Sequence, residues 1–269
     1  MKTASALTAF ILGVILGGLL ISPSAEAQGL GSTGDLPLEV TAENGIEWQQ
    51  EKQVFLARGN ALATRGDVTV QADVLRAYYK EKDGGGTDVW RIDANGGVTI
   101  ISPGQTVTGE EAVYDVANKI LVVKGGREVR LESPDQTITA SGQLEYWEER
   151  QMAVARGNAV AIREGRTLRA DVLVARFANQ GGRTRVTQVE AFDNVVIVTE
   201  KDRVSSDRGL YDLGTGLATL TGSVKITRGG NQLNGCRATV NLNTGISRIF
   251  SCPNDRVRTL LDRSPKASQ

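Results

Sequence analysis

The chain has 269 residues, in which 31 lysines and arginines balance 31 aspartates and glutamates, and it contains no histidine. The lack of histidine excludes Ser-His-Asp and Cys-His catalysis and histidine-ligated metals, and we expect neither a metal nor a cofactor. A neutral chain without a basic run offers no electrostatic case for nucleic acid as a partner. Binding, scaffolding and carboxylate-only catalysis are the candidate functions.

The N-terminal segment predicts export. Lys2 is followed by an apolar run from Ala6 to Ile21, and then by Ala25-Glu26-Ala27, which has the small-x-small pattern of a signal-peptidase site. We therefore expect residues 1–27 to be a cleaved signal peptide and residues 28–37 to be a flexible segment. The alternative is a retained membrane anchor, because the apolar run falls only slightly short of the roughly 20 residues that span a bilayer.

From residue 38 onward the sequence repeats a unit of about 30 residues. Each unit opens with an apolar residue, one further residue and a small residue, and its second half has alternating aliphatic residues, which indicates strands with one buried face. Two strands per unit predict an antiparallel all-β domain of roughly 14 to 16 strands over residues 38–255, folded over as a sandwich, jelly roll or solenoid. Residues 256–269 are expected to be a frayed, solvated tail. The seven units begin near Leu38, Val68, Thr106, Thr137, Thr167, Arg203 and Gln232.

Two cysteines near the C-terminus predict a disulfide. If Asn243–Gly245 forms a three-residue hairpin loop, Val240 pairs with Arg248, and Cys236 lies directly opposite Cys252. In an exported chain this arrangement favours a Cys236–Cys252 disulfide over the alternative of two buried free thiols.

Several recurrent segments together carry a family resemblance. They are the Val40-Thr41-Ala42-Glu43 and Val70-Gln71-Ala72-Asp73 openings, the Ala57–Ala61 and Ala155–Ala159 segments, the aromatic residues that end the first strands, and the Gly235–Gly245 stretch. Through them, nearly all of residues 38–252 resembles the OstA-like family of lipopolysaccharide-transport proteins. The resemblance implies a non-enzymatic protein with an open β-jelly roll, built from about seven repeated two-strand units, whose interior takes the acyl chains of lipopolysaccharide.

The same resemblance implies a location and partners. It places the protein in the periplasm and makes the lipid A acyl chains of lipopolysaccharide its ligand. It also implies edge-to-edge joining with inner-membrane LptC-like and outer-membrane LptD-like jelly rolls, and head to tail with further copies of the chain. The candidate edges are Leu38–Ala42 and the terminal hairpin Leu233–Cys252, because an open edge strand can accept an added strand.

The inner face of the predicted jelly roll holds the candidate lipid-binding residues. Large aliphatic residues would line the acyl path, and alanines in the first and fourth units would widen it. The alternative is a closed taper in which facing large residues fill the space. The candidates are Ala61, Ala63, Val98, Ile100, Val129, Leu131, Ala159, Ala161, Val195, Ile197, Val224 and Ile226.

Other functions remain open from the sequence alone. A β-solenoid polysaccharide hydrolase or lyase would need a pair of carboxylates, and we interpret Glu110-Glu111 and Glu148-Glu149 as exposed charges rather than such a pair. A surface adhesin is a further alternative, as is a membrane-anchored LptC-like protein that retains its apolar N-terminal run. Five acidic residues recur at equivalent places in successive units, which indicates solvated strand positions instead of a single site: Glu43, Asp73, Glu110, Asp171 and Asp207.

Overall fold

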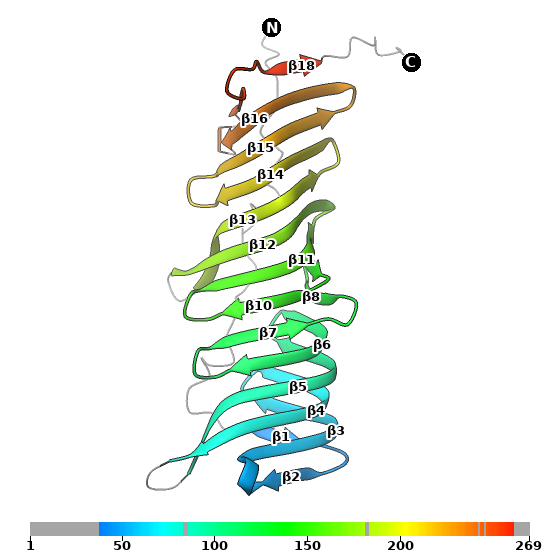
Figure 1. Cartoon of the computed structure of the whole chain (residues 1–269), viewed down its shortest axis with the longest axis vertical. Coiled ribbons are helices and arrows are strands. Elements are labelled where there is room, and N and C mark those ends of the chain that lie inside the picture. Colours follow the sequence, from blue (N-terminus) through cyan, green and yellow to red (C-terminus); the bar gives the residue numbers. More distant parts are fainter. Residues whose placement is uncertain (1–37, 83–85, 181–182, 242, 245, 261–269) are drawn as a thin grey trace. The chain divides into compact units, whose positions relative to one another are not determined.

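The computed structural model describes residues 38–82, 86–180, 183–241, 243–244 and 246–260 (Figure 1). Within these ranges the secondary structure consists of β-strands and one short 3-10 helix, and neighbouring strands pair in antiparallel fashion. This arrangement confirms the predicted all-β jelly-roll class. The predicted signal peptide and the flexible segment up to residue 37 lie outside the described residues. Over the part of the chain that is described, no helix is both long and apolar enough to span a membrane.

The described strands form two compact units, which we treat separately. The N-terminal unit contains residues 38–159 and 176–185, and the C-terminal unit contains residues 160–175 and 186–260. Three strands contribute residues to both units: β11 (Met152–Arg163), β12 (Arg166–Gln180) and β13 (Arg183–Val198).

In the N-terminal unit, coloured blue to green in Figure 1, consecutive long strands pair with one another. The sheet begins with β1 and β2, which both pair with β3, and it continues from β6 through β7 and β8 to β10 and β9. The 3-10 helix Gln50–Lys52 connects β2 to β3. The strands are β1 (Glu39–Thr41), β2 (Ile46–Gln49), β3 (Val54–Arg65), β4 (Val68–Glu81), β5 (Thr87–Ser102), β6 (Gln105–Asp115), β7 (Ile120–Lys124), β8 (Val129–Ser133), β9 (Gln136–Ala140), β10 (Gln143–Trp147) and β11 (Met152–Arg163).

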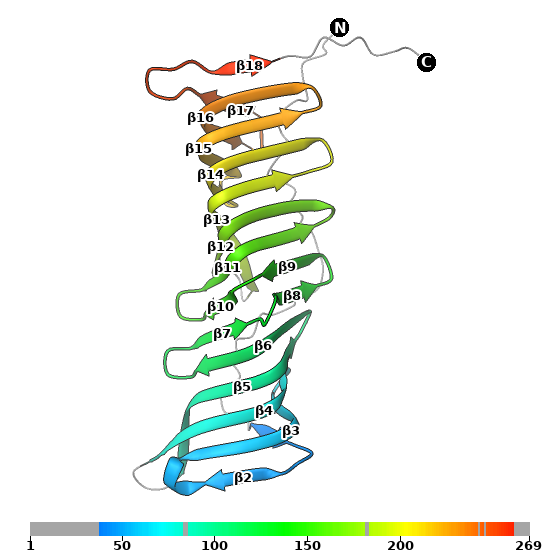
Figure 2. The same cartoon turned by 45° about the vertical axis from the view of Figure 1, so that its right-hand side comes forward.

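In the C-terminal unit, β13, β14, β15 and β16 pair in sequence order. Two short strands pair with β16 at the end of the sheet (Figure 2). Strand β17 pairs with the second half of β16, and β18 pairs with the first half. The strands are β14 (Asp202–Asp212), β15 (Leu217–Arg228), β16 (Asn231–Asn241), β17 (Ile246–Phe250) and β18 (Arg258–Leu260).

The predicted repeat is confirmed. Strands β1, β4, β6, β9, β12, β14 and β16 begin within one residue of the seven predicted unit openings. The described residues nevertheless contain 18 strands instead of 14 to 16. The difference arises because four of the predicted strands are each interrupted near the middle and form the pairs β1/β2, β7/β8, β9/β10 and β17/β18.

In five of the repeated units, the second half is one long strand that bends at two consecutive residues with left-handed backbone. In β3 these residues are Gly59 and Asn60, with φ of 80° and 44°, and the register with β4 shifts between Arg58 and Ala61. Glycine adopts this conformation freely and asparagine tolerates it, so these residue types mark the bend. The equivalent pairs are Gly96-Gly97 in β5, Gly157-Asn158 in β11, Asp193-Asn194 in β13 and Gly222-Ser223 in β15.

The recurring acidic residues lie against these bends. Asn60 Nδ2 donates a hydrogen bond to Glu43 Oε1 at 3.2 Å. At Gly96 a Cβ atom would overlap the carboxylate of Asp73. The same relation holds for Asn194 with Asp171 and for Gly222 with Asp207. The acidic residues therefore repeat because the bend repeats, which supports a structural role over a hydrolytic one.

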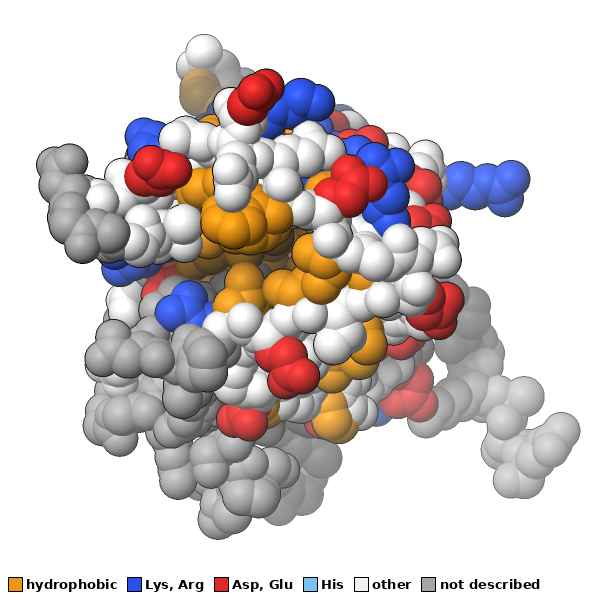
Figure 3. All heavy atoms as spheres, turned by 90° about the horizontal axis from the view of Figure 1, so that it is seen from below, with side chains coloured by type: hydrophobic (Ala, Val, Ile, Leu, Met, Phe, Trp, Pro, Cys, Tyr) orange, Lys and Arg blue, Asp and Glu red, His pale blue; other side chains and the backbone are white. Residues whose placement is uncertain are grey.

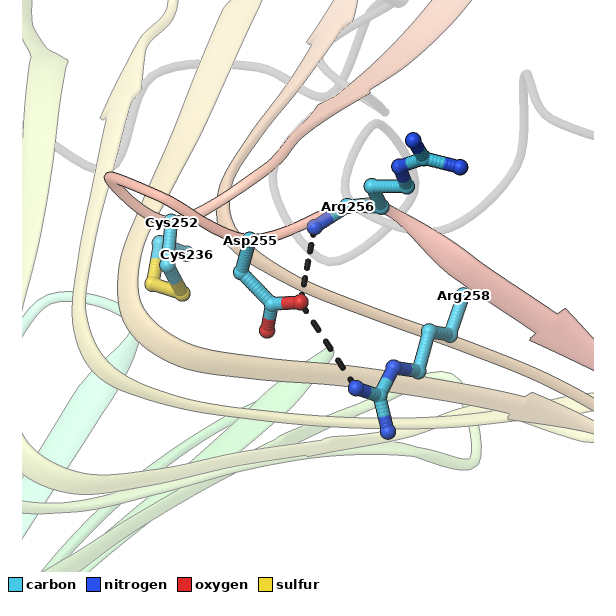
Figure 4. Close-up of a disulfide and its surroundings, with 5 residues drawn as sticks. All are labelled: Cys236, Cys252, Asp255, Arg256 and Arg258. Atoms are coloured by element: carbon cyan, nitrogen blue, oxygen red, sulfur yellow. Dashed lines mark hydrogen bonds and ion pairs between the residues drawn. A yellow bond between two sulfur atoms is a disulfide. The ribbon is translucent and has the colours of Figure 1, made fainter.

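The C-terminal unit contains the predicted disulfide between Cys236 and Cys252, whose Cα atoms are 4.9 Å apart (Figure 4). The predicted register is wrong by one residue, because four residues rather than three separate β16 from β17. Val240 consequently pairs with Ser247 and not with Arg248. The bridge still forms because Cys252 lies beyond the end of β17, where the chain has left the strand ladder.

Part of the predicted C-terminal tail belongs to the sheet. Residues Arg258–Leu260 form β18 and pair with Gln232–Asn234 of β16, so the expectation of a frayed end is wrong for them. A turn leads into this strand, in which the Asp255 amide donates to the Cys252 carbonyl at 3.1 Å. Residues 261–269 lie outside the described range.

Candidate functional site

The N-terminal unit contains an apolar hollow that is open to solvent. Its volume is about 430 Å³, including the part open to solvent, and nearly all of its lining surface is apolar. Figure 3 shows hydrophobic side chains gathered inside an opening whose rim carries charged side chains. The lining residues are Leu38, Ala63, Arg65, Val70, Ile92, Ala94, Ile100, Ala112, Tyr114 and Leu121.

The hollow lies between the two arms of bent strands. One wall consists of residues that follow the bend in β3 and β5 or precede it in β4, with Ala63 opposite Val70 and Val70 opposite Ile100. The other wall comes from the arms on the far side of the bend, where Ala94 faces Ala112. Strand β5 contributes to both walls, with its bend at Gly96-Gly97 between Ala94 and Ile100, so this left-handed bend helps to form the trough.

Three alanines leave the space between these walls unfilled. Ala63, Ala94 and Ala112 are buried and each presents only a methyl group. Ala63 pairs with Val70, and Ala94 and Ala112 pair with each other between Leu75 and Val123. Protein interiors in which larger side chains face one another normally pack with few voids. The hollow is therefore a consequence of residue size at three positions.

Ten of the twelve candidate lipid-binding residues are buried, and Leu131 and Ala161 are half-buried. Only Ala63 and Ile100 are among the residues that line the hollow. In the N-terminal unit the candidates nearest the mouth share one cross-strand row, Ala63–Val70–Ile100–Val107–Leu131. In the C-terminal unit, Ile197 and Ile226 flank Val204 in the equivalent row. Their contact with lipid stays a prediction.

Sequence reasoning missed the whole second wall, which contains Ile92, Ala94, Ala112, Tyr114 and Leu121. The available signal was the aromatic residue near the end of each first strand. Tyr114 is such a residue, and it pairs with Ile92 on one side and Leu121 on the other. Tyr114 is buried and lines the hollow, so this aromatic residue is part of the trough and not only a strand end.

Two polar side chains line the mouth of the hollow. Arg65 is the last residue of β3 and Tyr114 is the penultimate residue of β6, so each lies at the outer margin of its wall. Burial raises the pKa of Tyr114 to about 12, and the negative charge of Glu148 acts in the same direction while Arg65 opposes it. The phenol of Tyr114 is therefore protonated throughout the physiological range.

The equivalent margin in the C-terminal unit holds an ion pair. Arg228, the last residue of β15, donates through Nε and Nη2 to the two carboxylate oxygens of Asp202, at 2.5 and 2.6 Å. Asp202 is buried and lies directly across the strand pair from Arg228. In the N-terminal unit the register of Glu39 with Thr64 places Leu38, not an acid, opposite Arg65.

The second strand of the N-terminal unit and the last strands of the C-terminal unit expose large apolar side chains. Ile46 and Trp48 of β2 are 51% and 56% exposed, and Ile246 of β17 and Leu260 of β18 are 53% and 67% exposed. Trp48 stacks on Phe55 with ring centroids 5.6 Å apart. Of these strands, β17 lies within a predicted pairing edge, whereas β2 and β18 lie just beyond the predicted edges.

Comparison with known proteins gives three findings. A family model described as LptA/(LptD N-terminal domain) LPS transport protein matches residues 39–146 and again residues 137–246. An uncharacterized protein of Rhizobium meliloti (strain 1021) is 28% identical over 113 residues, which are 40% of this chain and 60% of that relative's length. The crystal structure of LptH, described as the LptA homologous periplasmic component of the lipopolysaccharide transport device from Pseudomonas aeruginosa, has a TM-score of 0.21 and 9% identity, and the match covers 84% of this chain and 96% of that one.

Proposed function

Because the chain belongs to the family of LptA and LptD N-terminal-domain lipopolysaccharide transport proteins, we propose that it binds lipopolysaccharide in the periplasm and shields the acyl chains during transport. The observation that carries this proposal is the open apolar hollow between the two walls of the N-terminal unit. A site with this lining suits hydrocarbon, since each methylene removed from water contributes about 0.8 kcal/mol.

The chemistry of such a site needs only burial and release. Shielding an acyl chain requires no nucleophile, metal or cofactor, which is consistent with a chain that has no histidine. The recurring acidic residues are engaged with the bends of the strands, so they offer no support for the polysaccharide hydrolase alternative.

The proposal extends to assembly through sheet edges. We infer that β1 and β2 at one end of the sequence, and β17 and β18 at the other, receive strands from LptC-like, LptD-like or identical jelly rolls. Strand addition supplies main-chain hydrogen bonds, and exposed apolar residues such as Trp48 and Leu260 add contact area. Light scattering of the full-length wild-type chain and of its Trp48→Glu variant tests this part. We expect the variant to form smaller assemblies, and unchanged assembly of the variant would count against the inference.

Two adjacent isoleucines provide a direct test of lipid binding. Ile100 of β5 is buried and lines the hollow, whereas Ile101 is 46% exposed and points to the other face. A photo-crosslinking amino acid is placed at each position in the full chain, within cells that make lipopolysaccharide. We expect lipopolysaccharide adducts from position 100 and few from position 101. Equal labelling at both positions, or labelling of protein alone, would contradict the proposed binding site.

The periplasmic location has its own test. Sequencing the N-terminus of the mature protein is expected to give a start at Gln28, the residue after the predicted cleavage site. A protein that keeps residues 1–27 would instead support the membrane-anchored alternative.

A further inference from the structure

Positive charge is concentrated in the strands of the C-terminal unit. Residues 202–260 contain eight lysines and arginines against four aspartates and no glutamate, although the chain as a whole is neutral. The excess of positive charge is therefore local, and its place on the sheet decides which partner it can attract.

Cross-strand pairing places three exposed arginines on one face of strands β14 to β17. Arg208 and Arg237 lie on one cross-strand row that ends at Phe250. Arg248 lies two residues before Phe250 in β17 and therefore shares its face. The adjacent row, which contains Leu220, is buried on the inner face. The three arginines consequently lie on the face that is turned away from the trough.

Large apolar side chains are exposed on the same face. Leu210, Leu217, Ile246 and Phe250 are 38%, 39%, 53% and 43% exposed, and strand alternation and register put them on the face of the arginines. A single exposed leucine is ordinary, but a cluster of exposed apolar residues marks an interaction surface. We call this cluster the outer patch: Arg208, Leu210, Leu217, Arg237, Ile246, Arg248 and Phe250.

The arginines of the outer patch lack carboxylate partners. Within the described part of the chain, Arg208, Arg237 and Arg248 form no ion pair with an aspartate or glutamate. Asp212 lies on the same face, but its carboxylate caps the following turn through a hydrogen bond of 2.8 Å. The guanidinium of Arg237 instead lies 5.5 Å from the centre of the Phe250 ring. The positive charge of the patch is thus available to a partner.

The N-terminal unit neutralises its arginines where the C-terminal unit does not. Arg156 of β11 donates to the carboxylate of Glu145 on the neighbouring strand β10. Arg130 of β8 pairs with Glu132 at 2.7 Å. Unpaired arginines on an outer face are therefore not a general feature of the repeat, and they favour an anionic partner for the C-terminal unit.

The mixture of arginines and exposed apolar side chains matches the interface of a lipid bilayer. Apolar side chains of a peripheral protein enter the boundary between headgroups and acyl chains, and its basic side chains meet anionic headgroups. A small soluble anion would pair with the arginines but would leave Ile246 and Phe250 in water. A bilayer surface covers both kinds of side chain.

We propose that the outer patch binds the surface of a membrane that contains anionic phospholipids. Arg208, Arg237 and Arg248 contact the phosphate groups, and Ile246 and Phe250 enter the headgroup region. This inference goes beyond the proposed transport of lipopolysaccharide, and it holds whatever occupies the hollow of the N-terminal unit.

Vesicle flotation with the chain purified from the envelope without detergent tests the proposal. One set of vesicles contains phosphatidylethanolamine and phosphatidylglycerol, and the other contains only phosphatidylcholine, which has no net charge. We expect the wild-type chain to float with the anionic vesicles far more than with the neutral ones. This binding should weaken as salt is added, because salt screens the attraction between arginines and headgroups.

Variants of the outer patch separate its two contributions. Combining Arg208→Gln, Arg237→Gln and Arg248→Gln should weaken binding to anionic vesicles by about a hundredfold, which is about fivefold for each charge. Phe250→Ser should weaken it by about tenfold at low and at high salt, because the loss of apolar contact is not screened.

Matched variants of the N-terminal unit serve as controls. Arg130→Gln removes the same charge from an exposed arginine, and Ile101→Ser removes an exposed apolar side chain. Both controls should bind anionic vesicles as wild type does. All substituted side chains are exposed, so the thermal unfolding midpoints should stay close to that of wild type and show that each variant is folded.

Three results would overturn the proposal: no flotation with anionic vesicles, equal flotation with neutral vesicles, or equal losses in the controls and the patch variants. If the wild-type chain binds soluble polyglutamate through the three arginines but does not bind vesicles, the partner is an acidic protein and the membrane proposal is overturned. None of these results changes the photo-crosslinking expected at position 100, so the proposed function is tested separately.

Discussion

The two units pack differently at equivalent positions of their inner walls. Ala94 faces Ala112 in the N-terminal unit, and the equivalent residues of the C-terminal unit are Ala191 and Gly209. A Cβ atom at Gly209 would lie 3.4 Å from Leu220, a residue that is 1% exposed. Glycine at this position thus gives room to a leucine on the next strand, whereas Ala112 lies beside the smaller Val123.

The outer margins of the two units also differ in residue type. Arg228 lies across the strand pair from the buried Asp202 and donates to its carboxylate, whereas the residue across from Arg65 is Leu38. The two units share left-handed bends and strand lengths, but they differ at a few equivalent positions. The comparison teaches that one repeated scaffold can present different side chains at the same place on its inner face.

The largest expected effect tests the rigidity of the C-terminal unit. Replacing both cysteines, Cys236→Ser with Cys252→Ser, should lower the unfolding free energy of this unit by about 3 kcal/mol, the chain-entropy value for a loop with a sequence separation of 16. Hydrogen exchange should show lost protection in β16 and β18, and unchanged protection in β3 to β5. Equal loss in both units would contradict the comparison.

The next largest change in stability is expected when the ion pair between Asp202 and Arg228 is broken. Asp202→Asn should lower the unfolding free energy by about 2 kcal/mol in urea titrations, because it removes the negative charge that the half-buried Arg228 binds. The double variant Asp202→Leu with Arg228→Met, which makes this margin apolar, serves as the control and should recover most of the loss. A double variant as unstable as Asp202→Asn would show that packing at this margin, not the unpaired charge, sets the cost.

Two equivalent alanines measure the free space directly. Ala191→Leu should destabilise the protein by about 1 to 3 kcal/mol, because it overpacks a filled interior. Ala94→Leu should cost less than about 0.5 kcal/mol, since the hollow accommodates the added carbons. Thermal and urea unfolding of both variants checks this difference, and equal costs would mean that the hollow closes in solution.

The smallest effect concerns a buried carboxylate on the outer face of the N-terminal unit. Burial alone would raise the pKa of Glu145, but hydrogen bonds from Arg156, Gln143 and Trp147 outweigh it and lower the pKa below its usual value of 4.5. The folded-state pKa is depressed, so this stabilisation is present above pH 4.5 and is lost as the pH falls through the folded-state pKa. Glu145→Gln should therefore flatten the fall in unfolding free energy below pH 4.5 without changing lipid binding. If the unfolding free energy of the variant falls below pH 4.5 as steeply as that of wild type, Glu145 is not responsible for the loss of stability in acid.

Most of the fold follows from the sequence because the repeat carries it. Period-two alternation and glycine- or asparagine-containing bends recur in nearly every unit, so each unit supports the placement of the next. The disulfide partners were predictable for the same reason, although the register was not. The connection between Asn241 and Ile246 is one residue longer than the predicted hairpin, and loop length alone sets which residues face each other.

The site was only half predictable. The aliphatic wall with Ala63 and Ile100 follows from alternation, but the opposite wall depends on how each strand bends back on itself. Whether Ala94 and Ala112 leave a hollow depends on facing side chains, as the contrast with Leu220 shows. The buried oxygen of Glu148 was missed because a charge next to Glu149 after a strand ordinarily indicates solvent exposure.

The most direct test of the central claim is native mass spectrometry of the full chain purified without detergent from the envelope of cells that make lipopolysaccharide. Wild type and Ile101→Phe, which adds bulk on the outer face, are expected to carry lipopolysaccharide. Ala94→Phe, which fills the hollow, is expected to lose it while keeping a cooperative unfolding transition. Lipopolysaccharide bound equally to Ala94→Phe and to wild type, or absent from both, would contradict the claim that the N-terminal hollow holds the acyl chains.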